Sequence, residues 1–176
     1  EVLNENMEEY DVIIFDARVY GGEVPFYYLQ KINDFVQDGG GLIVVGSDEL
    51  TATNSLAATP LGEILPFTPL DGTLENEFVP QITERGLHHP LGRLIERAHG
   101  SSDNWGSWYS MANTQARSDA EMIMSDGAGH PLLTLSKPGD GRVAVLASEQ
   151  SWLWARGHGG GGPAVELNRN LVRWAA

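Results

Sequence analysis

Two short runs of consecutive apolar residues stand out in the first quarter of the chain, at 12–15 and at 42–45. Both are rich in β-branched side chains, and such runs are typical of strands buried on both faces of a parallel sheet with helices on each side. Between them, apolar residues recur at three- and four-residue spacing from Pro25 to Gln37, which predicts an amphipathic helix that the glycines at 39–41 end. The strand, helix and strand predict a right-handed βαβ unit.

The last third of the chain has a different pattern, in which short apolar runs alternate with glycine-containing turns. The runs lie at 121–124, 131–135 and 142–147, and the turns between them predict antiparallel hairpins. A final amphipathic helix is expected from Pro163 to about Trp174.

These elements together predict one mixed α/β domain over residues 1–176, with a parallel start, an antiparallel C-terminal extension and a closing helix. The middle of the chain, from 66 to 118, has little periodicity and predicts only a short strand at 78–79 and a helical turn at 91–97. A doubly wound sheet normally has more than two parallel strands, and the run at 12–15 has the pattern of a central strand. We therefore expect that an N-terminal βα portion lies outside this chain.

Composition narrows the classes of function. The 176 residues carry a net charge of −13, and such an acidic surface repels the phosphates of nucleic acids and anionic membranes. No apolar run reaches the roughly 18 residues that a membrane helix needs, so no membrane insertion by this segment is expected. The absence of cysteine excludes disulfides, thiolate zinc sites and a cysteine nucleophile. The five histidines lack metal-ligand spacing, so neither a metal nor another cofactor is expected.

Several segments, taken together, resemble known proteins. The segments at 10–16, 38–46 and 89–91 are similar to the class I glutamine amidotransferase-like superfamily. More specific pieces resemble the glutamine amidotransferase-like domain found near the C-terminus of large bacterial membrane proteins of unknown function: Asn104-Trp105-Gly106-Ser107-Trp108, Gly141-Arg142-Val143-Ala144-Val145-Leu146, and Trp152-Leu153-Trp154-Ala155-Arg156-Gly157 with Gly160-Gly161-Gly162-Pro163 behind it. The resemblance runs over nearly the whole chain.

The resemblance implies a flavodoxin-like three-layer sandwich whose sheet begins with a further strand and helix. It also implies that this chain is one domain of a larger protein, a soluble domain of a bacterial membrane protein, on a side of the membrane that the sequence does not indicate. Its expected partner is another protein or a small ligand of that parent protein.

The chain departs from the family pattern at the position of the catalytic nucleophile. Active members of the superfamily place a Cys in a G-x-C-x-G elbow between a strand and a helix, with a His and a Glu as partners. Here the strand at 42–45 continues into Gly46-Ser47-Asp48, and no Cys exists anywhere in the chain. Glutamine hydrolysis through a thioester is therefore not expected, and the resemblance then implies a non-catalytic binding or interaction module.

In a second interpretation, the chain is a serine-dependent hydrolase. Ser47 follows the second strand, where a nucleophile would lie, and it could act if His89 or His158 accepted its proton, with a carboxylate behind that histidine. In the simpler alternative, Ser47 and Asp48 cap a helix or loop and His89 makes a structural hydrogen bond.

Ligand-binding candidates include polar and aromatic residues. Asp16 and Arg18 follow the first strand and Asp48 follows the second. Loops at the carboxyl ends of parallel strands are where ligands bind in open α/β sheets. Trp105 and Trp152 belong to a set of four tryptophans with Trp154 and Trp108, and two rings at alternate positions of an extended segment point to one face. With Arg156 they could form a platform for a sugar or a peptide, and their simpler role is to fill the core beneath irregular loops.

Overall fold

The computed structural model describes residues 6–20 and 24–176 of the chain, with five α-helices and eight strands in those ranges. The helices are α1 (Phe26–Gln37), α2 (Glu84–His88), α3 (Pro90–His99), α4 (Ser151–Ala155) and α5 (Ala164–Ala175). The strands are β1 (Val12–Asp16), β2 (Gly41–Val45), β3 (Phe67–Leu74), β4 (Gln81–Ile82), β5 (Met111–Ala116), β6 (Glu121–Ser125), β7 (Pro131–Ser136) and β8 (Arg142–Leu146). None of the helices in the described ranges is long and apolar enough to cross a membrane.

Six strands form one mixed sheet in the order β1-β2-β8-β7-β6-β4. The first three run parallel, and the β8–β7, β7–β6 and β6–β4 pairs are antiparallel. The predicted βαβ unit and the predicted antiparallel extension are therefore confirmed. β8 belongs to both parts, because it pairs with β2 on one side and with β7 on the other.

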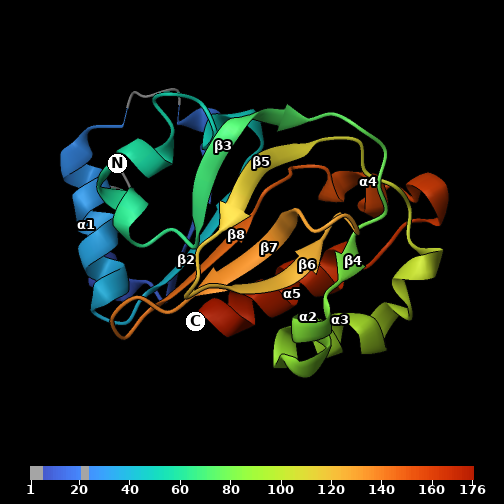
Figure 1. Ribbon diagram of the computed structural model, residues 1–176. Coiled ribbons are helices and arrows are strands. Elements are labelled where there is room, and N and C mark those ends of the chain that lie inside the picture. The colour runs from blue at the N-terminus through green and yellow to red at the C-terminus, as the bar shows by residue number, and fades with distance from the viewer. Residues whose placement is uncertain (1–5, 21–23) are drawn as a thin grey trace.

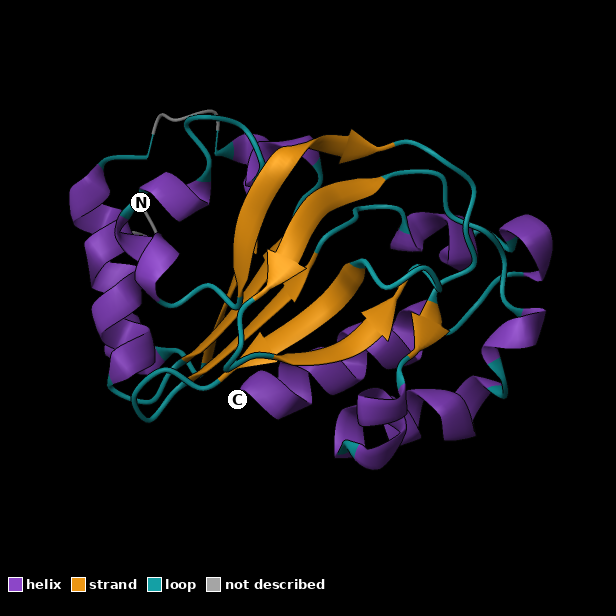
Figure 2. Ribbon diagram, viewed as in Figure 1, coloured by secondary structure: helices purple, strands orange, loops and turns teal. Residues whose placement is uncertain are grey.

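Helices cover the sheet on both faces and make three layers (Figures 1 and 2). Along β2 the side chains alternate, so that Leu42 and Val44 pack into the apolar cluster beneath α1, and Ile43 packs into the cluster beneath α5. This double burial explains why the strand reads as an uninterrupted apolar run. The result is a flavodoxin-like α/β sandwich with a mixed sheet, as expected.

A second sheet, of two antiparallel strands, was not predicted. It consists of β3 and β5, with an irregular register between Pro69 and Thr73. Much of β3 is exposed and its burial does not alternate regularly, so the strand leaves no period of two in the sequence. Of the elements expected in the middle of the chain, 78–79 contributes a single bridge from Phe78 to Trp108, and the helical turn is the longer helix α3.

The segment after β8 corrects one expectation. Trp152 and Trp154 were expected on an extended segment with both rings on one face, but they lie in helix α4. Side chains two positions apart on a helix are separated by about 200° around its axis, so the two rings point in different directions. Trp152 is 53% exposed and Trp154 is 3% exposed.

Candidate functional site

The carboxyl ends of the three parallel strands meet at one edge of the sheet. The register pairs Asp16 with Val45 and Val45 with Leu146, so the residues that follow each strand lie side by side. Ser47 comes two residues after β2, and Ser148 comes two residues after β8. The structure therefore brings the sequence candidates Asp16, Arg18, Ser47 and Asp48 to one end of the molecule.

An ion-pair network joins the ends of β1 and β8. Arg18 donates from Nη2 to Asp16 Oδ2 over 2.6 Å, and its Nε lies 3.2 Å from Glu149 Oε2. Asp16 also accepts the backbone N–H of Arg18 at 3.1 Å, which fixes the turn after β1. All three side chains are partly exposed, and the guanidinium therefore bridges two strands at the surface.

The charges in this network are unbalanced. The hydrogen bonds from Arg18 lower the pKa of Asp16, and Asp16 in turn raises the pKa of Arg18. Burial raises the pKa of Glu149. The positive charge of Arg18 works against this increase, and the nearby carboxylates of Glu49, Asp16 and Asp48 add to it. The strand ends thus hold an excess of negative charge around one arginine.

Ser47 is almost buried, at 8% exposure. Its backbone angles, φ −126° and ψ −107°, belong to neither helix nor strand and turn the chain from β2 into the 3-10 helix Asp48–Leu50. The hydroxyl of Ser47 lies 3.5 Å from that of Ser110, and its backbone N–H donates to Glu49 Oε2 at 3.1 Å. Among the described residues, no histidine is hydrogen-bonded to Ser47.

Three polar residues that were not selected from the sequence lie beside Ser47 and are joined by hydrogen bonds: Ser110, Ser148 and Gln150. Ser148 donates through its hydroxyl to the carbonyl of Ser110 at 2.8 Å. The side-chain oxygen of Gln150 accepts the backbone N–H groups of Tyr109 and Ser110. These bonds hold the segment before β5 against the end of β8. The strand-end rule that selected Asp16 applies equally to the residues after 142–147, and it could have found Ser148 and Gln150.

The two candidate histidines have partners other than Ser47. His89 accepts the backbone N–H of Leu91 at the start of α3, and its ring packs edge-on against Trp174. Burial lowers its pKa. Trp174 belongs to the last turn of α5, where Ala175 packs on Gly41 at the start of β2, whereas Ser47 lies beyond the opposite end of that strand. His158 accepts from or donates to the hydroxyl of Tyr109 at 2.9 Å and is exposed.

Most of the tryptophan set belongs to the core. Trp105, Trp108 and Trp154 are at most 4% exposed, and their rings pack together with centroids 4.6 and 5.3 Å from that of Trp154. Trp154 donates from its indole N–H to the carbonyl of Gly106 at 2.7 Å. Because its ring is buried, Trp105 cannot contact a ligand at the surface. Trp152 remains exposed, with the Arg156 guanidinium 5.9 Å from its ring centre.

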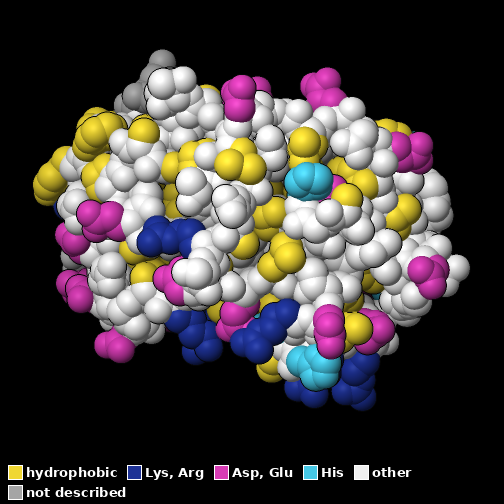
Figure 3. All heavy atoms as spheres, in the orientation of Figure 1, with side chains coloured by type: hydrophobic (Ala, Val, Ile, Leu, Met, Phe, Trp, Pro, Cys, Tyr) yellow, Lys and Arg dark blue, Asp and Glu magenta, His cyan; other side chains and the backbone are white. Residues whose placement is uncertain are grey.

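The described part of the chain contains no group of three His, Asp or Glu side chains placed to hold a metal ion. Acidic side chains are dispersed over the face shown in Figure 3 and do not form one acidic patch there.

Comparison with known proteins places the chain in a family. The family model described as "Putative glutamine amidotransferase" matches residues 5–158. No curated protein matches the sequence.

Solved structures share the fold. The cytoplasmic protein STM3548 from Salmonella typhimurium has a TM-score of 0.74 at 21% identity, covering 97% of this chain and 73% of its own. STM1381 from Salmonella typhimurium LT2, also titled a cytoplasmic protein, has a TM-score of 0.69 at 18% identity, covering 94% and 72%. A β-galactosidase from Rahnella sp. R3 matches with a TM-score of 0.61 at 16% identity, over 98% of this chain and 24% of the enzyme. The family match spans most of the chain, and the chain therefore belongs to the glutamine amidotransferase-like family.

Proposed function

We propose that this chain is a non-catalytic member of its family and acts as a binding or interaction module. The observation that carries the proposal concerns Ser47 at the strand end: in the described part of the chain, its hydroxyl is hydrogen-bonded to no histidine or carboxylate. A serine attacks a carbonyl only when a neighbouring group takes its proton. Within residues 6–20 and 24–176, the side-chain partner of the Ser47 hydroxyl is the hydroxyl of Ser110.

The backbone at this position also opposes acyl transfer. Such reactions need N–H donors aimed at the oxygen on which negative charge develops. The N–H of Ser47 instead donates to the carboxylate of Glu49, so this donor is already occupied by a negative group. The missing cysteine, the partner of the Ser47 hydroxyl and this hydrogen bond together support a non-catalytic role.

The surface that we assign to binding is the edge around Arg18. The Arg18 side chain is 56% exposed although it bridges Asp16 and Glu149, so a ligand can reach it without unfolding the turn. The excess of carboxylates there favours a ligand or partner that brings positive charge.

The proposal also includes the parent membrane protein that the resemblance implies. Fractionation of cells that express the full-length gene product would test this part, and we expect to recover the product in the membrane pellet.

A pair of serine variants tests the absence of catalysis. The protein would be assayed for glutaminase and for hydrolysis of p-nitrophenyl acetate, as wild type, Ser47→Ala and Ser118→Ala, the last being an exposed serine between β5 and β6. We expect no glutaminase activity and an ester hydrolysis that is equal in all three. Turnover that Ser47→Ala abolishes and Ser118→Ala leaves intact would refute the proposal.

The binding role has its own test. Thermal unfolding would be followed with arginine, spermidine and, as an anionic comparison, citrate, for wild type and Arg18→Ala. We expect the cationic compounds to raise the unfolding midpoint of the wild type. The increase should be larger for Arg18→Ala, because that change frees the carboxylates of Asp16 and Glu149 to bind them. Equal unfolding midpoints in every case would argue against this surface.

Carbohydrate recognition is a second candidate, and its support is the exposed ring of Trp152. Flat aromatic faces stack on sugars, and the β-galactosidase neighbour shows that this fold occurs within a sugar-processing enzyme. Titration with oligosaccharides, followed by tryptophan fluorescence, should give a response that Trp152→Ala removes. A flat titration would exclude it.

A further inference from the structure

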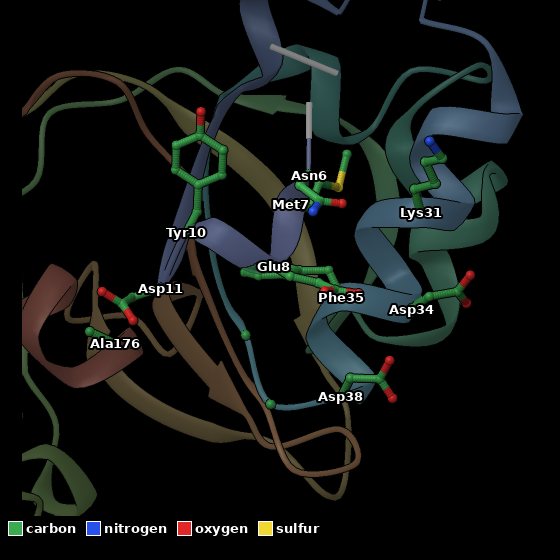
Figure 4. Close-up of a pocket in the computed structure, with 12 residues that line it drawn as sticks. Asn6, Met7, Glu8, Tyr10, Asp11, Lys31, Asp34, Phe35, Asp38 and Ala176 are labelled. Atoms are coloured by element: carbon green, nitrogen blue, oxygen red, sulfur yellow. The ribbon is translucent and has the colours of Figure 1, made fainter. Parts of the chain in front are cut away.

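Two of the cavities in the described part of the chain differ in the charges that line them. The larger, of about 480 Å³, opens at the amino end of β1, and Lys31 is the one cation among its described lining residues (Figure 4). In Figure 4, Tyr10 and Asp11 lie on one side of this cavity, and the end of α1 with Asp34 and Asp38 lies on the other. Its charge is therefore mostly of one sign, and we call it the acidic cavity.

The smaller cavity, of about 210 Å³, has charges of both signs beside an apolar wall. The core residues Leu65 and Leu135, each 1% exposed, contribute to the lining together with Trp174. The volume is below the roughly 300–1,000 Å³ of sites for drug-sized ligands and suits a ligand of about the size of an amino acid. The charged residues of the lining are Glu63, Arg117, Asp119, Glu121 and Lys137.

Hydrogen bonds tie the walls of the smaller cavity together. Ser136, at the end of β7, donates through its hydroxyl to the carbonyl of Ile64 at 3.1 Å. The backbone N–H of Arg117, which follows β5, donates to the carbonyl of Pro66 at 3.0 Å. The cavity is therefore formed without a ligand, as binding sites for small molecules usually are. Ser136 pairs with Val143 near the start of β8, so the cavity lies at the opposite end of that strand from the polar strand ends.

The two cations of this cavity are loosely held. Lys137 is exposed and forms no hydrogen bond or ion pair within residues 6–20 and 24–176. The Nε of Arg117 lies 3.8 Å from Asp119 Oδ1, and its Nη1 lies 3.4 Å from the carbonyl oxygens at 62 and 63. These contacts are long for charged hydrogen bonds, which are typically about 2.7–2.9 Å. Both cations therefore keep N–H donors for an anionic group.

The carboxylates of the cavity differ in how they are neutralised. Glu121 is bound by Arg85, whose Nη2 lies 2.7 Å from Glu121 Oε2. Glu63 is exposed and forms no ion pair with the described residues, and Asp119 has the long contact with Arg117. With Glu121 neutralised, two cations and two carboxylates remain in the lining. A ligand with one charge of each sign complements this lining better than an ion of a single sign.

Trp174 gives the cavity an aromatic wall. Its ring is partly buried in the last turn of α5 and packs edge-on against His89, with the ring centroids 6.3 Å apart. Burial lowers the pKa of His89, the carboxylate of Glu121 works against this decrease, and the positive charge of Lys137 adds to it. The charge of Lys137 therefore acts on the side of the cavity where the indole lies. An indole wall favours an apolar or aromatic group of a ligand.

We propose that the smaller cavity binds a free α-amino acid with an apolar or aromatic side chain. Lys137 and Arg117 hold the carboxylate of the ligand. Asp119 and Glu63 hold its ammonium group. The side chain of the ligand packs against Trp174. The proposal does not depend on the proposed function, because this cavity lies at the other end of the sheet from the polar strand ends.

Calorimetric titration with three related ligands tests the need for both charges. The probes are L-phenylalanine, 3-phenylpropionate, which lacks the ammonium group, and phenethylamine, which lacks the carboxylate. We expect L-phenylalanine to bind with a Kd below about 10 mM, and each analogue to bind at least roughly 10-fold more weakly, because it leaves charged side chains without a partner. Weaker binding of L-phenylalanine would overturn the proposal, and so would an analogue that binds as tightly as the amino acid.

The two lysines of the chain provide a matched pair of variants. Lys137→Gln removes an exposed cation of the smaller cavity and should weaken the binding of L-phenylalanine roughly 5- to 10-fold, because a charged hydrogen bond is lost. Lys31→Gln makes the same change in the acidic cavity and should leave the Kd unchanged. Equal Kd values for wild type and Lys137→Gln would overturn the proposal, as would an equal loss in Lys31→Gln.

Nuclear magnetic resonance locates the ligand without a substitution. Addition of L-phenylalanine should shift the indole N–H signal of Trp174 and the amide signals of Arg117 and Ser136. The amide signals of Ser148 and Gln150, at the polar strand ends, should stay in place. Shifts at the polar strand ends or in the acidic cavity, with the Trp174 signal unchanged, would overturn the proposal.

Discussion

The tryptophan cluster and the polar strand ends lie next to each other in this protein and differ in almost every physical respect. Trp105, Trp108 and Trp154 are buried and packed ring against ring. Arg18 and Glu149 are partly exposed and held by an ion pair. In the sequence, the aromatic residues are the more conspicuous of the two groups.

The difference teaches that a rare residue type does not by itself mark a site. A large apolar ring contributes mainly by leaving water, and a loop-rich region beside a sheet needs such rings to fill its core. A surface ion pair contributes little to folding, so its arrangement at the strand ends leaves room for a role in binding. The following predictions test this division, from the largest effect to the smallest.

Trp108→Ala should have the largest effect. The ring is 0% exposed, so its removal leaves a cavity and should cost roughly 3–5 kcal/mol of unfolding free energy. Urea denaturation followed by circular dichroism would measure it. A loss below about 1 kcal/mol would contradict the core assignment.

Trp154→Phe should have a smaller effect, because much of the ring is retained. The change removes the indole N–H that bonds to Gly106 and leaves that carbonyl without its partner, which should cost about 1–2 kcal/mol. The same denaturation experiment applies, with Trp108→Phe as the comparison, since the indole N–H of Trp108 has no hydrogen-bond partner among the residues that the structure describes. If both variants lose equal stability, the hydrogen bond makes no contribution of its own.

Glu149→Gln should stabilise the protein slightly at neutral pH. Because burial raises the pKa of Glu149, the folded state binds its proton more readily than the unfolded state does. Its contribution to stability therefore falls as the pH rises from the ordinary glutamate pKa through the raised one. The gain at pH 7 should be below about 1 kcal/mol, since the side chain is partly exposed and screened. Denaturation at pH 4 and pH 7 would show it, and a variant less stable than wild type at pH 7 would contradict it.

Trp152→Ala should have the smallest effect, within about 0.5 kcal/mol, because the ring is 53% exposed on the outer side of α4. It is the matched counterpart of Trp108→Ala, with the same residue type removed from the other environment. A large loss of stability here would remove the distinction between the buried cluster and the surface.

The site could be predicted in part. The strand-end rule selects Asp16, Arg18 and Ser47, and the structure places them together. It could not select Ser110, which reaches the site from the start of β5, because that contact joins segments 63 residues apart. His89 was misleading for the same reason, because nothing in the sequence shows that it lies toward the opposite end of the sheet from Ser47.

The sequence by itself determined the parallel start, the antiparallel extension and the loss of thioester chemistry. Each of these follows from local pattern or composition: apolar runs that bury both faces of a strand, glycine turns of hairpin length, and the absence of cysteine. Only the tertiary structure decided which tryptophan is exposed, because α4 is too short to show a helical period and its burial depends on what packs above it. The tertiary structure also decided that Ile14 is exposed while Ile43 is buried. Both residues lie in runs of four apolar residues, and the neighbours that the fold supplies make the difference.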